Sequence, residues 1–87
     1  MKMEEETEIK IGKKPIMNYA TAIDKAKDEA KVVRVKAASA RNIQRLIGAL
    51  SVLREKDKIE VFDSYFDFFD FNKKFMPRLI ISVRKKC

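Results

Sequence analysis

The sequence contains no histidine, no tryptophan and a single cysteine, Cys87, at its last position. One cysteine excludes a disulfide bond within the chain, and the lack of imidazole and of a second thiol excludes the usual zinc clusters. The chain also lacks a glycine-rich phosphate loop and an evident pair of carboxylates. Acid–base or nucleophilic catalysis usually relies on groups of these kinds. We therefore expect a protein that is not an enzyme and that needs no cofactor or metal.

Long apolar segments are also missing. No uninterrupted run approaches the ~18 residues that a transmembrane helix needs, and the opening Met-Lys-Met-Glu-Glu-Glu lacks the basic and then apolar character of a signal peptide. We therefore expect a soluble cytoplasmic protein with no membrane partner. A chain of 87 residues can form one small domain, whose limited core favours association into a dimer.

Positive charge predominates, with 20 lysines and arginines against 13 aspartates and glutamates and a net charge of +7. Residues 1–8 hold one lysine and four glutamates, a balance of −3, so residues 9–87 carry +10. The sequence predicts an acidic, flexible N-terminal tail (residues 1–8) followed by a single basic domain (residues 9–87). Such a domain is typical of proteins that bind a polyanion, although the same charge also suits simple solubility or an anionic lipid surface.

The hydrophobic pattern predicts six elements in the order strand, helix, strand, helix, strand, strand. The strands are expected at residues 7–11, 32–36, 58–71 and 78–84, and the helices from Pro15 and from an N-cap at Ser39. The apolar stripes comprise Ile16, Tyr19, Ala20, Ile23, Ala26 and Ala30 in the first helix and Ile43, Leu46, Ile47, Leu50 and Leu53 in the second. A right-handed crossover makes the first two strands parallel, whereas the last two form a hairpin. The predicted fold is an α/β (α+β, two-layer) domain with a mixed four-stranded sheet and two helices.

Two lysines, Lys13 and Lys14, precede the proline at which the first helix is expected to begin. A helix start carries a partial positive charge and unsatisfied N–H groups, so two ammonium groups beside it are unfavourable unless an anion is bound there. The segment therefore predicts a phosphate site, with two solvated lysines in a loop as the alternative.

The second helix contributes two further basic candidates. Arg41 and Arg45 lie four residues apart, on one face and away from the apolar stripe, and form either a phosphate-binding surface or an ordinary solvated helix face. Gly48, in the middle of the same helix, costs about 1 kcal/mol relative to alanine, which indicates a close neighbour. That neighbour is either this chain's own first helix or a second subunit.

The final hairpin is rich in aromatic residues. They are Tyr65, Phe66, Phe68, Phe69, Phe71 and Phe75, with Asp63, Asp67 and Asp70 between them. Their alternation is imperfect, so the strand is either covered on both faces or interrupted by a bulge. The rings form either core or subunit interface, or a platform for unpaired bases, which the aspartates disfavour. Lys73, Lys74 and Arg78 have the charge to approach a nucleic-acid backbone.

Residues 12–19, Gly-Lys-Lys-Pro-Ile-Met-Asn-Tyr, resemble the opening of the archaeal Alba family, and the similarity continues through residues 33–37, 57–61 and 80–86. The resemblance implies the fold of the C-terminal domain of translation initiation factor three. It also implies a chromatin protein of the nucleoid that binds duplex DNA, and RNA in addition, through phosphate contacts as a homodimer. Lys13 corresponds to a site of reversible acetylation, which implies an acetyltransferase and a deacetylase as partners.

Several features depart from the pattern of that family. One arginine expected before the second helix is absent, and the hairpin, which is an arm along the minor groove in Alba proteins, is shorter and more aromatic here. The segment between the second helix and third strand lacks the residues through which dimers pack side by side. Within the family, Gly48 points to the second subunit. An alternative function is a protein scaffold or ribonucleoprotein subunit that pairs with another Alba-type chain.

Overall fold

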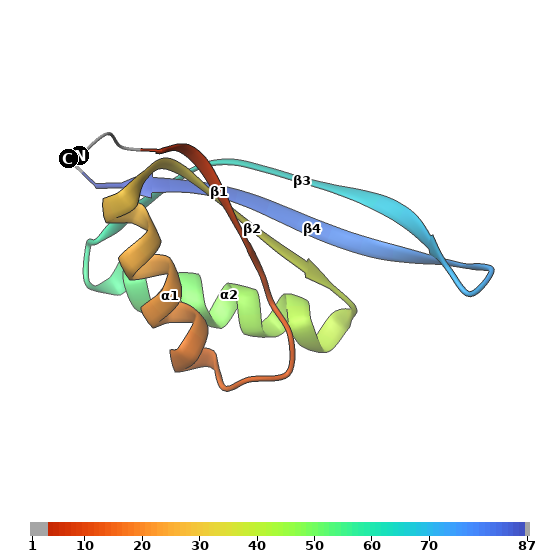
Figure 1. The fold of residues 1–87 in the computed structure, drawn as a ribbon. Coiled ribbons are helices and arrows are strands. Elements are labelled where there is room, and N and C mark those ends of the chain that lie inside the picture. The colour runs from red at the N-terminus through yellow and green to blue at the C-terminus, as the bar shows by residue number, and fades with distance from the viewer. Residues whose placement is uncertain (1–3, 87) are drawn as a thin grey trace.

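The computed structural model describes residues 4–86, in which four strands form one sheet and two helices pack against one of its faces (Figure 1). The elements are β1 (Glu4–Lys10), α1 (Ile16–Glu29), β2 (Ala30–Ala38), α2 (Ala40–Glu55), β3 (Ile59–Phe71) and β4 (Lys74–Lys85). This is the predicted order and the predicted two-layer architecture. Among these residues, no helix combines the length and the apolar character that crossing a membrane would take.

The sheet is mixed, in the order β1-β2-β4-β3. β1 and β2 are parallel, and β4 pairs antiparallel with both β2 and β3. The register between β3 and β4 shifts between Val61 and Asp63, which confirms the bulge among the alternatives for the aromatic strand. Side chains alternate across β2, so that Val33 and Val35 are buried while Arg34 and Lys36 lie partly exposed on the face without helices.

The core lies between the helices and the sheet. Its buried apolar residues are Ile11, Tyr19, Ala20, Ile23, Val33, Val35, Ala37, Leu46, Ala49, Leu50, Leu53, Ile59 and Val83. Ser39 is the N-cap of α2, as predicted, and its hydroxyl accepts the amide N–H of Asn42 at 3.4 Å. Ile47 departs from the predicted stripe because it is half exposed.

Strand β1 begins within the segment expected to be a flexible tail. From Glu4 onward the chain is paired with β2, and residues 1–3 of that segment lie outside the described residues. Its glutamates face cations of β2: Glu5 contacts Lys31 at 3.0 Å, and Glu8 contacts Lys36 at 2.9 Å. The acidic residues that indicated a flexible tail therefore belong to an edge strand, β1. Their carboxylates neutralise lysines and arginines of the neighbouring strand β2.

The hairpin is longer than predicted. β4 begins at Lys74 instead of residue 78, and Asn72 and Lys73, both with positive φ, make the tight turn between the strands. β2 pairs with β4 only as far as Arg78, so residues 68–77 form an arm that projects past the helices (Figure 1). That the arm is shorter than in Alba proteins stays a prediction. Pro77 lies inside β4, in this arm, where β2 no longer runs beside the strand.

Gly48 faces α1 of its own chain. A β-carbon at this position would lie 2.9 Å from Cδ1 of Ile16, so the absence of a side chain lets α1 pack closely against α2. The preference for a second subunit as the neighbour was therefore wrong, because the packing of the two helices alone accounts for the glycine.

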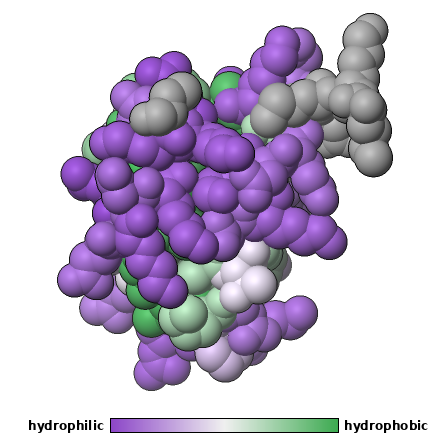
Figure 2. All heavy atoms as spheres, turned by 90° about the vertical axis from the view of Figure 1, so that its left-hand side faces the viewer, coloured by the Kyte–Doolittle hydropathy of each residue, from purple (hydrophilic) through white to green (hydrophobic). Residues whose placement is uncertain are grey.

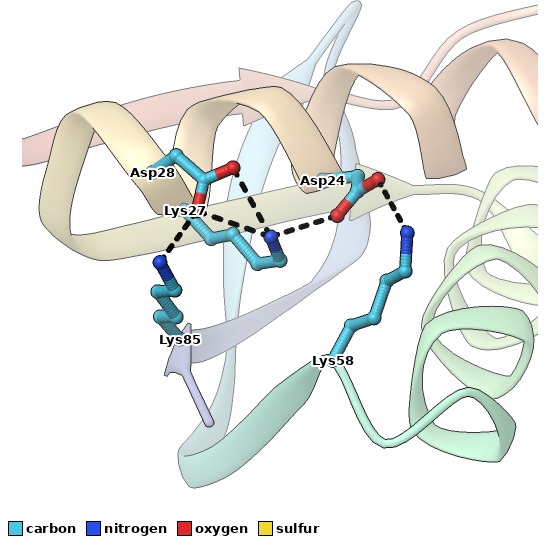
Figure 3. A network of polar contacts seen from close by, with 5 residues as sticks. All are labelled: Asp24, Lys27, Asp28, Lys58 and Lys85. Carbon is cyan, nitrogen blue, oxygen red and sulfur yellow. Dashed lines mark hydrogen bonds and ion pairs between the residues drawn. The ribbon is translucent and has the colours of Figure 1, made fainter. Parts of the chain in front are cut away.

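A charge network fastens α1 to the ends of β3 and β4 (Figure 3). Its centre is Lys27, which is only 6 % exposed and whose Nζ lies 2.8 Å from Asp24 and 3.2 Å from Asp28. Lys58 contacts Asp24 at 3.1 Å, and Lys85 contacts Asp28 at 3.2 Å. The network lies toward the end of the molecule opposite the arm (Figure 1). The surface of that end is mostly hydrophilic (Figure 2). Nothing in the sequence pattern signalled that Lys27 is buried.

These contacts make the fold sensitive to acid. Hydrogen bonds from Lys27 and Lys58 hold the pKa of Asp24 below its ordinary value, and those from Lys85 and Lys27 do the same for Asp28. A carboxylate whose pKa is lower in the folded state stabilises the fold above its unfolded pKa, about 3.9 for aspartate, and loses that contribution as the pH falls through the folded pKa.

We expect Asp24→Asn to lower the free energy of unfolding at pH 7 by about 1 kcal/mol, because Lys27 then lacks its nearest carboxylate. The melting temperature should fall by roughly 4–8 °C, and the difference from the unmodified protein should shrink as the pH is lowered below about 4. Thermal melts over this range test it, with the exposed Asp63→Asn as the control. A difference that stays constant down to about pH 2 would contradict this account.

Candidate nucleic-acid interface

The loop between β1 and α1 is held by the hydroxyl of Tyr19. This oxygen accepts the backbone N–H of Gly12 at 2.7 Å and that of Lys14 at 3.0 Å. Tyr19 is itself 8 % exposed and lies in the first turn of α1, so a core residue fixes the loop. Gly12 suits this approach, because a β-carbon there would lie 3.2 Å from the same oxygen, which is a tight contact.

The predicted phosphate site at the helix start changes in one respect. Pro15 is the N-cap of α1, and two of the loop amides expected to face an anion donate to Tyr19 instead. The helix start still lacks both a side-chain cap and an acidic residue in its first turn. Its dipole therefore remains unopposed, and the exposed Lys13 and Lys14 add positive charge beside it.

Arg45 joins the second helix to this loop. One of its terminal nitrogens donates to the carbonyl of Gly12 at 3.3 Å and to Oδ1 of Asn42 at 2.7 Å. The guanidinium is thus positioned by the loop on one side and by its own helix on the other. Sequence periodicity placed Arg45 on the correct face but gave no sign of either contact.

Arg41 lies one turn before Arg45 and is exposed. A depression of about 310 Å³ between the helices is lined by both arginines, together with Ile16 and Gln44. Arg45 thus lies against the loop that carries Lys13 and Lys14, and Arg41 lies one turn away on the same helix. We call the surface formed by Lys13, Lys14, Arg41 and Arg45 the loop–helix ridge.

The charges of the ridge contrast with those of the sheet. Lys13, Lys14 and Arg41 form no ion pair with any residue of the described part of the chain. On the sheet, by comparison, Arg34 lies 3.0 Å from Glu6, and Lys36 lies 2.9 Å from Glu8. The hydrogen bond and charge of Lys36 lower the pKa of Glu8. The cations of β2 at residues 34 and 36 are therefore neutralised by β1, whereas the cations of the ridge remain available.

Arg78, which was predicted to contact nucleic acid, is already occupied. It donates two hydrogen bonds to Asp67, at 2.9 and 2.7 Å, and its guanidinium lies 5.6 Å from the ring centre of Phe69. The hydrogen bond lowers the pKa of Asp67 and raises that of Arg78. A guanidinium that already donates two hydrogen bonds to a carboxylate has few N–H groups left to donate to a phosphate. We therefore remove Arg78 from the set of predicted phosphate-binding residues.

The other two predicted hairpin residues, Lys73 and Lys74, lie at the turn between β3 and β4, which is the tip of the arm and projects past the helices (Figure 1). The aromatic side chains along the hairpin are not core in the single chain. The most exposed are Phe62 at 42 %, Tyr65 at 41 %, Phe66 at 69 %, Phe68 at 62 %, Phe71 at 60 % and Phe75 at 77 %. Of the alternatives, a subunit interface and a base-stacking platform remain for these rings.

We expect Tyr19→Phe to lower the free energy of unfolding by about 1–3 kcal/mol, because two backbone donors lose their acceptor. Amide hydrogen exchange should accelerate at Gly12 and Lys14, whereas the amide of Ile11, which donates to the carbonyl of Lys36 at 2.8 Å, should be less affected. The exposed Tyr65→Phe serves as the control. Unchanged exchange at Gly12 and Lys14 would show that the hydroxyl does not hold the loop.

No protein-family model matches the sequence, and no curated protein matches it either. Solved structures do resemble the fold. ALBA1 from Trypanosoma brucei is similar with a TM-score of 0.79 and 14% sequence identity, over 91% of this chain and 68% of that protein. Alba from Thermoplasma volcanium is similar with a TM-score of 0.75 and 19% identity, over 90% of this chain and 99% of that one. The fold of this protein is therefore the Alba fold.

Proposed function

We propose that this protein binds nucleic acids without sequence specificity, coating or compacting duplex DNA and also binding RNA. The loop–helix ridge carries this proposal, because it gathers cations that have no carboxylate partner in the described chain on one surface, beside an uncapped helix start. Lysine and arginine side chains on such a surface suit phosphate oxygens, which are the same in every sequence. The Alba fold supports the proposal by analogy with its structural neighbours.

The protein acts as a dimer in this proposal. It exposes 6265 Å² of surface, whereas a compact monomer of 10.1 kDa is expected to expose about 5,300 Å². The projecting arm contributes to this excess, and a standard interface covers about 800 Å² of each partner. Exposed apolar side chains on α2 and the hairpin supply a surface to cover, among them Ile47, Phe66 and Phe75.

The same apolar surface also supports the second candidate function, a scaffold or ribonucleoprotein subunit that pairs with a related chain. Native mass spectrometry distinguishes the two, since a homodimer forms from the purified protein alone and a mixed dimer needs the second chain. For the first candidate function, the proposed binding of DNA places the protein on the chromosome, in the cytoplasm.

The salt dependence of binding tests the ridge. We expect log affinity for duplex DNA to fall with log salt at a slope of about −0.9 for each phosphate that the protein neutralises. The triple variant Lys13→Ala, Lys14→Ala, Arg41→Ala should bind more weakly and with a shallower slope, by about 0.9 for each phosphate that is no longer neutralised. Fluorescence anisotropy at several salt concentrations measures both quantities.

A matched control removes the same number of charges elsewhere. Lys25, Arg54 and Lys56 are exposed and, like the three ridge residues, form no ion pair within residues 4–86. Their replacement by alanine should leave the slope nearly unchanged. If the two triple variants bind with equally reduced affinity, binding depends on net charge and not on the ridge.

Lys13 is the proposed site of acetylation, to be set by an acetyltransferase and reversed by a deacetylase. Acetylation removes one positive charge from the ridge, so we expect Lys13→Gln to lower affinity for duplex DNA several-fold at low salt. Lys13→Arg retains the charge and should bind like the unmodified protein. Equal affinities for all three proteins in the same anisotropy titration would exclude this form of regulation.

A further inference from the structure

A second candidate site lies on the other side of the first turn of α2. Here the ends of β1 and β2 meet the base of the arm around a pocket of about 240 Å³. The side chains of interest in its lining are Lys10, Lys36, Asn42, Phe69 and Arg78. The hydrogen bond from Arg45 to Asn42 connects this pocket to the loop–helix ridge.

Phe69 and Arg78 give the pocket a flat, rigid surface. The guanidinium lies 5.6 Å from the centre of the ring, and its two hydrogen bonds to Asp67 fix its orientation. Phe69 is partly buried, in contrast to the more exposed rings farther along the arm. The guanidinium lies over one face of the ring, so a nucleobase of any kind can stack on the outer face of this cation–aromatic pair.

The charges around the pocket favour a base over a phosphate. Lys10, Lys36 and Arg78 contribute three positive charges, but Lys36 contacts Glu8 at 2.9 Å and Arg78 contacts Asp67 at 2.7 Å. The balance is 3 − 2 = +1, because Lys10, alone of these three cations, forms no ion pair with a described residue. One phosphate beside Lys10, with its base in the pocket, matches this balance.

Asn42 supplies a polar group for the edge of that base. Its side-chain oxygen accepts the hydrogen bond of Arg45, so the amide N–H groups are the part left to donate. The pocket is also smaller than the ~300–1,000 Å³ of typical sites for drug-sized ligands, which suits a single planar ring system.

We propose that this pocket binds one unpaired nucleotide. Its base stacks on Phe69 and Arg78, Asn42 donates to the edge of the base, and Lys10 contacts the adjoining phosphate. This inference rests on the proposed function and extends it: a duplex held by the ridge is bound more tightly where a nucleotide is bulged out beside it. The same chemistry accommodates DNA and RNA.

The experiment compares two duplexes that differ in one bulged nucleotide, the fluorescent adenine analogue 2-aminopurine, prepared both as DNA and as RNA. We expect the unmodified protein to bind the bulged duplex about tenfold more tightly than the fully paired one, and stacking to quench the fluorescence. Phe69→Leu retains an apolar side chain without the aromatic face. It should abolish both the quenching and the preference, with the affinity for the paired duplex unchanged.

Phe71→Leu is the matched control, because Phe71 lies on the same strand and the same face, two residues farther along, and does not line the pocket. It should keep the preference for the bulge. Lys10→Ala provides a second test, because it should reduce the salt slope for the bulged duplex and leave that for the paired duplex unaltered.

The outcomes separate the two proposals. Equal binding of bulged and paired duplexes by the unmodified protein overturns the pocket and leaves the ridge in place. Loss of the preference in both the Phe69 and the Phe71 variants also overturns it, because the arm then acts without a specific pocket. Failure to bind either duplex contradicts the proposed function itself.

Discussion

The hydroxyl of Tyr19 is the contact on which the proposed interface depends. By accepting the amides of Gly12 and Lys14, it fixes a short loop over the start of α1, and Arg45 then reaches the Gly12 carbonyl from α2. These few hydrogen bonds join the loop to the helix that follows it and to α2, in which Arg45 lies 33 residues after Gly12. Without them, Lys13 and Lys14 would be two mobile charges, and the ordering entropy of binding would oppose any phosphate contact.

The distribution of ion pairs determines which surface can bind a polyanion. On the sheet face without helices, acidic residues of β1 lie opposite basic residues of β2, and Asp67 engages Arg78 across the hairpin. The far end of the molecule has its own network around Lys27. The net charge of +7 does not by itself indicate where a polyanion binds. The positions of the cations without carboxylate partners in the described chain are more informative, and these cations include those of the ridge. The proposed pocket differs from the ridge because two of its three cations are paired with carboxylates. Stacking is therefore the main attraction between the pocket and a nucleotide.

Local patterns predicted the order of the elements and the cap at Ser39, and they gave the bulge in β3 as one of two alternatives, since each depends on neighbours in the sequence or on side-chain alternation. Contacts between distant segments were not predictable in the same way. The strand character of Glu5, Glu6 and Glu8 depends on cations more than twenty residues later, and the burial of Lys27 depends on how α1 meets β3 and β4. Arg78 was assigned to phosphate binding because the hairpin register that places Asp67 opposite it was not known. For the site, periodicity found Arg41 and Arg45 on one face, whereas the role of Tyr19 depends on a hydroxyl that a hydrophobic pattern does not register.

The central claim is that nucleic acid contacts the loop–helix ridge and not the neutralised sheet. Backbone amide chemical shifts, followed by NMR during titration with a short duplex DNA, test it most directly. We expect the largest changes at residues 12–14 and 41–45, with little change at residues 24–28 and along β1. Largest changes on the strand glutamates or around Lys27, with the ridge amides unmoved, would contradict it.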